Sequence, residues 1–229
     1  MSTLPELPAA CRLRGLTEAD LPALMPLHAA VMADLRDPSL FRLAGGPEAF
    51  FSSHVGARGE SWGVFLADEL VAYASLTLPR ADDRDNYARD LGWPPERAAR
   101  VAQLSAAMVA PEHRRLGLHG KLIDIRIARA QALGLPDLLV RAAPANALSR
   151  QTLIEHGFAL VWLGVQAEGS LRHIFWRPAD RMATGADDAG VIWADGADLE
   201  AQRVWLAAGR RGVRAREADH AIGFALPPD

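Results

Sequence analysis

Apolar residues recur along most of this chain at spacings that alternate between strand-like and helix-like, and glycines or prolines separate the segments. Short continuous apolar runs between turn residues are typical of buried strands, whereas spacings of three and four residues indicate helices. The predicted strands are residues 11–16, 62–67, 69–78, 100–109, 138–143, 158–165 and 171–177. The predicted helices are residues 17–35, 47–54, 118–133 and 147–156.

Proline modifies this pattern at two places. Pro22 and Pro26 fall inside the first helical segment, so we expect a kinked or broken helix after the capping residue Thr17. Residues 79–95 are polar and contain three prolines, which predicts a loop with a short helix around Tyr87.

The order of the elements predicts an α/β fold built on a mixed sheet (an α+β mixed sheet). A strand, a buried helix and another strand between residues 100 and 143 predict a parallel crossover. The strand pairs within residues 62–78 and 158–177 predict antiparallel hairpins. Helices are then expected on both faces of the sheet.

The C-terminal part of the chain has a different composition. We predict a main domain over residues 11–178, a small and acidic linker over 179–190, and a β-α-β appendage over 191–229. About forty residues bury little core alone, so the appendage is expected to pack on the main domain or on a second copy in a homodimer. Its predicted elements are a strand at 191–194, a helix at 198–208 and a strand at 221–226.

Composition narrows the class of protein. The chain has 229 residues, 50% of them apolar and 23% charged, as is ordinary for a globular protein. The net charge of −3 argues against a nucleic-acid partner, and no apolar run approaches the roughly 18 residues of a membrane span. Cys11 is the only cysteine, which excludes an intrachain disulfide and a thiolate metal cluster. Without a visible signal segment, we expect a cytoplasmic protein that contains no metal.

The segment between residues 109 and 122 carries the clearest chemical signal. A buried strand ends, a turn with arginines and glycines follows, and a long helix begins. Amides at a helix N-terminus are unpaired and carry the positive end of the helix dipole, so this turn is a candidate phosphate cradle. The alternative is a tight turn with two solvated arginines, Arg114 and Arg115. The spacings of the P-loop and of the dinucleotide fingerprint are both absent from the sequence.

Two stretches resemble signatures of the GNAT superfamily of acyl-CoA-dependent N-acetyltransferases. Val109, Pro111, Arg114 and Gly117 match the motif V-x-P-x-x-R-x-x-G-x-G/A, although its last small position is His119 here. The second stretch runs from Asn146 to the closing Gly157-Phe158. The resemblance covers about residues 11–178 and implies the mixed-sheet fold, acetyl-CoA as acyl donor, and transfer of its acetyl group to an amine.

The resemblance also implies which residues hold acetyl-CoA. The backbone at the end of the strand would bind the pantetheine arm, the turn would bind the pyrophosphate, and the second stretch would lie beside the cofactor. Asn146 is equally suited to a structural role as a helix N-cap. The implied cofactor-binding residues are Ala107, Met108, Val109, Arg114, Arg115, Leu116, Gly117, Leu118, His119, Gly120, Asn146 and Ser149.

Two residues that depart from the family pattern indicate which kind of amine accepts the acetyl group. Leu153 stands where many members have a tyrosine acid, and Arg141 stands where protein N-terminal acetyltransferases often have a glutamate. The sequence therefore favours direct attack by the primary amine of a small molecule in a ternary complex. The alternative is a catalytically degenerate acyl-CoA-binding or regulatory module.

No catalytic residue is assigned from the sequence. A base would raise the fraction of neutral amine, and the Val109 amide is a candidate donor to the oxyanion. His28 and His54 are candidate acceptor-site groups, although half-buried structural histidines are the commoner case. The other candidates, each of which a surface or structural role explains equally simply, are Asp82, Asp83, Asp85, Tyr87, Gln103, Ser105 and Glu168.

Overall fold

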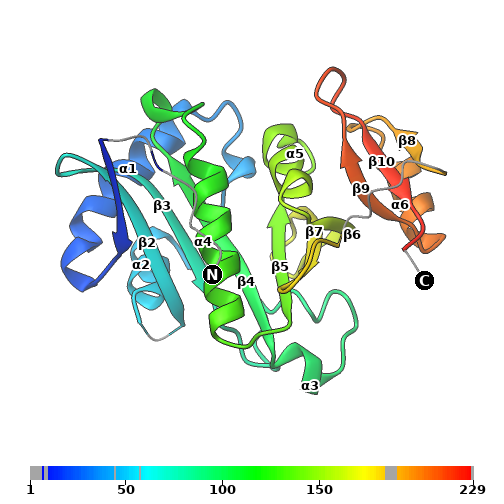
Figure 1. Cartoon of the computed structure of the whole chain (residues 1–229), viewed down its shortest axis with the longest axis horizontal. Helices are drawn as coiled ribbons and strands as arrows, with labels where there is room; N and C mark the ends of the chain where they lie inside the picture. The colour runs from blue at the N-terminus through cyan, green and yellow to red at the C-terminus, as the bar shows by residue number, and fades with distance from the viewer. Residues whose placement is uncertain (1–6, 8–9, 44, 57, 184–189, 228–229) are drawn as a thin grey trace. The chain divides into compact units, whose positions relative to one another are not determined.

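The computed structural model describes residues 7, 10–43, 45–56, 58–183 and 190–227 of the chain (Figure 1). The chain forms two compact units, and each is described by itself. The first comprises Met1–Pro79 and Ala102–Ala132, and the second comprises Arg80–Val101 and Leu133–Asp229. The domain division predicted from the sequence, with a boundary at 179–190, stays a prediction, and residues 184–189 of that linker lie outside the described residues.

The first unit is built on an antiparallel arrangement of strands in the order β1-β2-β3-β4. These strands are β1 (Cys11–Gly15), β2 (Gly59–Leu66), β3 (Glu69–Thr77) and β4 (Val101–Val109). The predicted hairpin is confirmed, because Leu66 pairs with Glu69 across a two-residue loop. Ala67 in that loop has a φ of 51°, as tight hairpin turns require.

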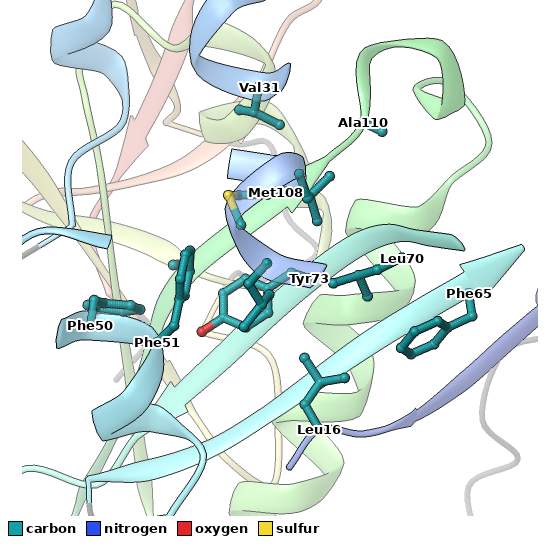
Figure 2. Packing of buried hydrophobic residues seen from close by; sticks show 12 residues of the cluster. Leu16, Val31, Phe50, Phe51, Phe65, Leu70, Tyr73, Met108 and Ala110 are labelled. Atoms are coloured by element: carbon teal, nitrogen blue, oxygen red, sulfur yellow. The ribbon is translucent and has the colours of Figure 1, made fainter. Parts of the chain in front are cut away.

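Helices cover both faces of these strands. They are α1 (Leu21–Asp34), α2 (Pro47–His54) and α4 (Leu118–Ala132). Figures 1 and 2 show α4 on the face opposite α1 and α2. Every residue of β3 after Glu69 is buried, as expected for a strand covered on both sides.

An aromatic and aliphatic cluster fills the space between α1, α2 and the strands (Figure 2). The Phe51 ring meets the Tyr73 ring edge to face, with centroids 5.2 Å apart. Such pairs add to the free energy gained by burying their surface. The buried members of the cluster are Leu16, Leu24, Leu27, Val31, Phe50, Phe51, Phe65, Leu70, Tyr73, Ala106, Met108 and Ala110.

The sequence predicts a kinked or broken first helix, and the structure shows that this helix is not broken. A short 3-10 turn at Glu18–Asp20 precedes α1, which then runs without interruption to Asp34. Pro22 lies in the first turn of α1, where a backbone N–H has no helical partner, so its ring costs nothing there. Pro26 lies inside the helix and removes one N–H of the ladder.

The second unit has strands in the order β5-β7-β6-β9-β10-β8. Its elements are α3 (Pro95–Ala98), β5 (Asp137–Ala142), α5 (Ala147–Glu155), β6 (Ala159–Val165), β7 (Leu171–Pro178), β8 (Ile192–Ala194), α6 (Leu199–Ala207), β9 (Arg211–Ala215) and β10 (Ile222–Ala225). The predicted hairpin of residues 158–177 is confirmed by the antiparallel pairing of β6 with β7. The parallel crossover expected between residues 100 and 143 runs from one unit to the other and stays a prediction.

The prediction of a short helix around Tyr87 is wrong. Residues around Tyr87 form turns, and the helix of this region is α3, which begins directly after Pro94. The Asn86 side chain explains the difference, because it donates to the carbonyl oxygens of Arg80 and Ala98 at 2.9 and 3.0 Å. These side-chain bonds to the backbone stabilise the turns and compete with the backbone hydrogen bonds of a helix.

The C-terminal segment contains a strand that the sequence analysis missed, so β-α-β is not its full description. Strand β9 has Val213 as its only large apolar residue, beside two arginines and Gly212, so its alternation is weak. It pairs antiparallel with β10 and, at Gly212, with Leu160 of β6. The segment therefore packs on its own chain, and assembly of a homodimer through it stays a prediction.

Polar side chains fix this segment to the rest of the second unit. Arg150 of α5 donates to the carbonyl oxygens of Gly196 and His220 at 2.7 and 3.4 Å. Gln202 of α6 links Nε2 of the buried His173 (2.8 Å) with the carbonyl oxygen of Asp195 (3.1 Å). Burial, followed by the charge of Arg150, lowers the pKa of His173 to about 3.

Candidate functional site

The turn that joins β4 to α4 has an unusual backbone. It consists of a 3-10 turn at Pro111–His113 and of residues 114–117, and α4 begins at Leu118. Arg115 has a φ of 63° and Gly117 a φ of 72°. Left-handed residues among right-handed ones turn successive N–H groups toward one side, which makes a concave anion site. A left-handed arginine costs about 1–2 kcal/mol, and such strain gathers at functional sites.

The amides of this turn are available to a ligand. The 3-10 turn ends with the bond from Arg114 N–H to Pro111 O, and the helical ladder starts with Lys121 N–H donating to Gly117 O at 3.1 Å. Between these bonds, the described residues show no backbone acceptor for the amides of Arg115, Leu116, Gly117, Leu118 and Gly120. Unpaired donors at the positive end of a helix favour an anion.

The turn is open to solvent. Residues 114–117 are exposed, and a Cβ added to Gly117 would meet nothing within 4 Å. Arg114 forms an ion pair with Asp34 at the end of α1, so this motif arginine ties the turn to the first helix. The residues present therefore fit a diphosphate at the amides, and in the part of the chain that the structure describes Arg115, unlike Arg114, has no ion-pair partner.

The strand before the turn presents the predicted pantetheine-binding segment. Ala107, Met108 and Val109 pair with β3 opposite Ala74, Tyr73 and Ala72. Met108 is buried in the core, whereas Ala107 and Val109 are half-buried.

A β-bulge in β4 precedes that segment. Ala74 pairs with Ala107 and Leu76 with Leu104, so Ser105 and Ala106 face the single residue Ser75. The Ser75 hydroxyl accepts from the Ala106 amide at 3.1 Å, which satisfies one backbone group that the bulge unpairs.

Arg126 of α4 satisfies the carbonyl groups at the bulge, a role that the sequence analysis missed. Its guanidinium is 2% exposed and donates to the carbonyl oxygens of Leu122, Ser75 and Ala106 at 2.7, 3.3 and 3.5 Å. Burial lowers its pKa to about 9, so it stays charged at neutral pH. The signal was present in the sequence, because Arg126 lies on the apolar stripe of its helix, four residues after Leu122.

The second motif places Asn146 at the start of α5. Its side chain accepts from the Ser149 amide at 3.1 Å, which confirms the N-cap role. Asn146 and Ser149 belong to the second unit, and their role toward the cofactor stays a prediction. Leu153 is buried, and Arg141 is bonded to Glu168 (2.7 Å) and Gln166 (3.0 Å).

The candidate bases of the second unit are mostly committed to other groups. Glu168 pairs with Arg141, Tyr87 is buried beneath the Arg141 guanidinium, and Asp83 accepts from the Arg80 amide. Asp90, which the sequence analysis did not single out, is half-buried and accepts from Gln166 at 2.6 Å. Burial raises its pKa.

The candidates of the first unit separate into two groups. His28 is half-buried beside the rings of Phe41 and Phe51, and burial lowers its pKa, as expected for a structural histidine. His54 and Ser105, in contrast, are joined through Thr77, a residue that the sequence analysis did not consider.

Comparison with solved structures places this arrangement among acetyltransferase folds. The ribosomal-protein-S18-alanine N-acetyltransferase of Escherichia coli aligns with a TM-score of 0.54 and 18% identity, over 77% of this chain and 97% of that one. A putative GNAT-family acetyltransferase from Desulfovibrio desulfuricans gives 0.56 and 15%, over 74% and 99%. The putative acetyltransferase yncA of Salmonella typhimurium, solved with its cofactor acetyl-CoA, gives 0.53 and 19%, over 78% and 98%.

No family model matches the sequence, and no curated protein matches it either. The structural likeness establishes the fold: an open α/β mixed sheet flanked by helices, as the sequence predicts and as in GNAT acetyltransferases. Within the described ranges, no helix is both long and apolar enough to cross a bilayer. Among the same residues, no group of three or more His, Cys, Asp or Glu side chains could hold a metal ion.

Proposed function

We propose that this protein is an N-acetyltransferase that moves an acetyl group from acetyl-CoA to the primary amine of a small molecule. The observation that carries the proposal is the turn at 114–117, where Arg115 and Gly117 are left-handed and, among the described residues, the following amides of Leu118 and Gly120 have no backbone acceptor. The fold supports it, because similar structures are acetyltransferases and one of them holds acetyl-CoA.

Each part of the site would have a separate task. Acetyl-CoA, when bound, would supply an acyl group activated as a thioester. The amides of Leu116–Gly120 would bind its diphosphate, and Arg115 would add charge from the surface of the turn. The backbone of Ala107–Val109 would bind the pantetheine arm, with the Val109 amide placed to stabilise a developing oxyanion. Arg114, Asn146 and Ser149 complete the proposed set.

The proposed acceptor is a small amine for two reasons. Leu153 offers no acidic hydroxyl, and the position of Arg141 is filled by a guanidinium already paired with Glu168. A thiolate leaves readily because the thiol pKa is about 8.5, so direct attack needs no dedicated acid.

Titration calorimetry with acetyl-CoA and a product assay with primary amines test this function. We expect saturable binding of acetyl-CoA and formation of N-acetylated product. Absence of binding at about 1 mM, equivalent to less than about 4 kcal/mol, would contradict the proposal.

A degenerate acyl-CoA-binding or regulatory module is the second candidate, and the buried Leu153 favours it. It predicts binding of acetyl-CoA without acetyl transfer to any amine in a broad panel. Robust turnover of a single amine would exclude it.

A further inference from the structure

Three side chains of the first unit form a hydrogen-bonded chain that runs from its interior toward solvent. They are His54 at the end of α2, Thr77 at the end of β3, and Ser105 in the bulge of β4. Nε2 of His54 lies 2.8 Å from Oγ1 of Thr77, which is hydrogen-bonded to Oγ of Ser105. His54 and Thr77 are buried, whereas Ser105 is half-buried.

The surroundings of His54 set its tautomer and the direction of the chain. Its Nδ1 lies 2.7 Å from the carbonyl oxygen of Phe50, which can only accept, so Nδ1 carries the hydrogen. Ser53 Oγ is 2.9 Å from the same nitrogen and donates its own hydrogen to Phe50 O. Nε2 of the neutral ring is then an acceptor, and it takes its bond from the Thr77 hydroxyl. The Thr77 oxygen can then accept from the Ser105 hydroxyl, which also lies 3.5 Å from its other acceptor, the carbonyl oxygen of Gln103.

The bulge brings Ser105 into this chain. Ala106 packs in the core beneath α1 and α2, and Ser105 reaches Thr77, whose hydroxyl meets His54 of α2. Neighbouring residues of a regular strand point to opposite faces, whereas these two share one face. A bulge re-aims side chains in this way, and bulges are frequent beside active sites.

We propose that Ser105, Thr77 and His54 form the proton relay that serves the acceptor amine, an inference that rests on the proposed function. Attack by the neutral amine would form the C–N bond, the C–S bond of the thioester would break, and the thiolate would leave. The amine nitrogen then carries a surplus proton. Ser105 Oγ takes that proton while its own hydroxyl proton passes to Thr77, and the Thr77 proton passes to Nε2 of His54. One proton enters at Ser105 and one is held at Nε2, so the relay needs no other reactant. Ser105 is the catalytic residue, and Thr77 and His54 act through it.

Both ring nitrogens of His54 have hydrogen-bond partners that would accept from the protonated ring. In the imidazolium, Nδ1–H keeps Phe50 O and Nε2–H gains Thr77 Oγ1, so both donors have acceptors. The Phe50 ring stacks on the imidazole with centroids 3.9 Å apart and planes within 17°. An aromatic face attracts a cation.

The kcat values of variants at Thr77 and Ser105 test the relay. Thr77→Val preserves shape and removes the hydroxyl, and Thr77→Ser keeps it. With acetyl-CoA and with benzylamine and cadaverine as amine probes, we expect Thr77→Val and Ser105→Ala to lower kcat about 10- to 100-fold. Affinity for acetyl-CoA by calorimetry should change by less than about twofold, and Thr77→Ser should restore most of kcat. Wild-type kcat in Thr77→Val or Ser105→Ala would overturn the relay.

The tautomer of His54 gives a readout that needs neither acetyl-CoA nor turnover. Nitrogen-15 NMR of the free protein should show His54 as the Nδ1–H tautomer, with an Nε2 signal that shifts in Thr77→Val and returns in Thr77→Ser. A purely structural role for Thr77 predicts no loss of kcat beside such a shift. An Nε2–H tautomer would reverse the chain and overturn the proposal.

The two proposals fail in distinguishable ways. Absence of acetyl-CoA binding overturns the proposed function, and the relay with it, whatever the tautomer of His54. Binding without turnover of any amine overturns the acetyltransferase function together with the relay and leaves only the coenzyme site standing. Binding and turnover with unaffected hydroxyl variants overturn the relay alone.

Discussion

The backbone angles of Arg115 and Gly117 decide the direction in which the amides of the turn point. Both residues are left-handed, and between them the chain turns its amides away from its own carbonyl groups. Glycine adopts this conformation without strain, whereas arginine does not. Because the left-handed conformation is unfavourable for arginine, contacts elsewhere in the fold must hold Arg115 in it. At this scale the proposed phosphate cradle depends first on the φ angles of the turn and second on its charge.

Replacing Gly117 by alanine tests the proposed phosphate cradle by adding a single methyl group to it. The added Cβ meets no neighbour, so the fold should survive with a loss of about 1 kcal/mol from the left-handed strain. A methyl group on the concave face should weaken acetyl-CoA binding by about tenfold or more, as measured by calorimetry. Gly134→Ala is the matched control, because Gly134 has a φ of 67° and equal space at the other end of the same helix. Equal affinities in the two variants would contradict the assignment.

His173 gives a prediction about pH. Its pKa is about 3 in the folded protein, against about 6.5 in the unfolded chain, so the unfolded state binds the proton more readily. The stability that this group contributes is therefore complete above about pH 6.5 and is lost as the pH falls toward 3. The slope approaches 1.4 kcal/mol per pH unit for one proton.

The variant His173→Gln keeps a donor for Gln202 and cannot titrate. We expect it to be less stable than the wild type at pH 7 and to lose part of the slope between pH 6.5 and 4. Chemical unfolding of both proteins at a series of pH values measures this. Parallel curves across that window would contradict a neutral, buried His173.

Among the elements, β4 carries most of the proposed function. Its bulge turns Ser105 toward α2, its last residues form the predicted pantetheine segment, and its end leads into the cradle. A bulge unpairs backbone groups, which are costly when buried. Ser75 supplies an acceptor for one of them, and Arg126 supplies donors for others. The strand and α4 are therefore linked by hydrogen bonds as well as by packing.

Arg126→Met should show what the buried guanidinium contributes. Methionine fills a similar volume and leaves the carbonyl oxygens of Ser75 and Ala106 without a donor, at a cost of about 1–3 kcal/mol in the free energy of unfolding. Denaturant unfolding measures the loss. Arg129→Met on the same helix is the control, since its ion pair with Glu60 is about 40% exposed and should be worth less than about 1 kcal/mol. A larger loss in the control would refute the role of Arg126.

At the scale of the whole molecule, the C-terminal segment is part of the second unit. It extends the order of strands beyond β6, and Arg150 and Gln202 fix it through carbonyl groups of its own loops. Among the described residues, Nε of Arg150 and Nδ1 of His173 have no hydrogen-bond partner. The junction is therefore polar and incompletely satisfied, which is typical of a region that opens before the core does.

Arg150→Met should loosen the segment without unfolding the protein. The carbonyl oxygens of Gly196 and His220 lose their donor, so amides in β9 and β10 should exchange hydrogen about tenfold faster or more, since about 1.4 kcal/mol is a factor of ten. Exchange followed by mass spectrometry measures this, with the strands of the first unit as internal reference. Unchanged protection in β9 and β10 would show that Arg150 does not hold the segment.

Local pattern predicted most elements of this protein, but not strand β9 or the turns around Tyr87. The period of apolar residues predicted the hairpins of residues 62–78 and 158–177 and the helix that begins at Leu118, and the glycines and arginines of the turn indicated an anion site. Contacts between distant residues were settled by tertiary structure alone: His54 with Thr77 and Thr77 with Ser105 are 23 and 28 positions apart, and Arg126 with Ser75 is 51. The physical reason is that periodicity records only which face is buried. A hydrogen bond depends on the register, the bulge and the packing that bring two polar atoms together.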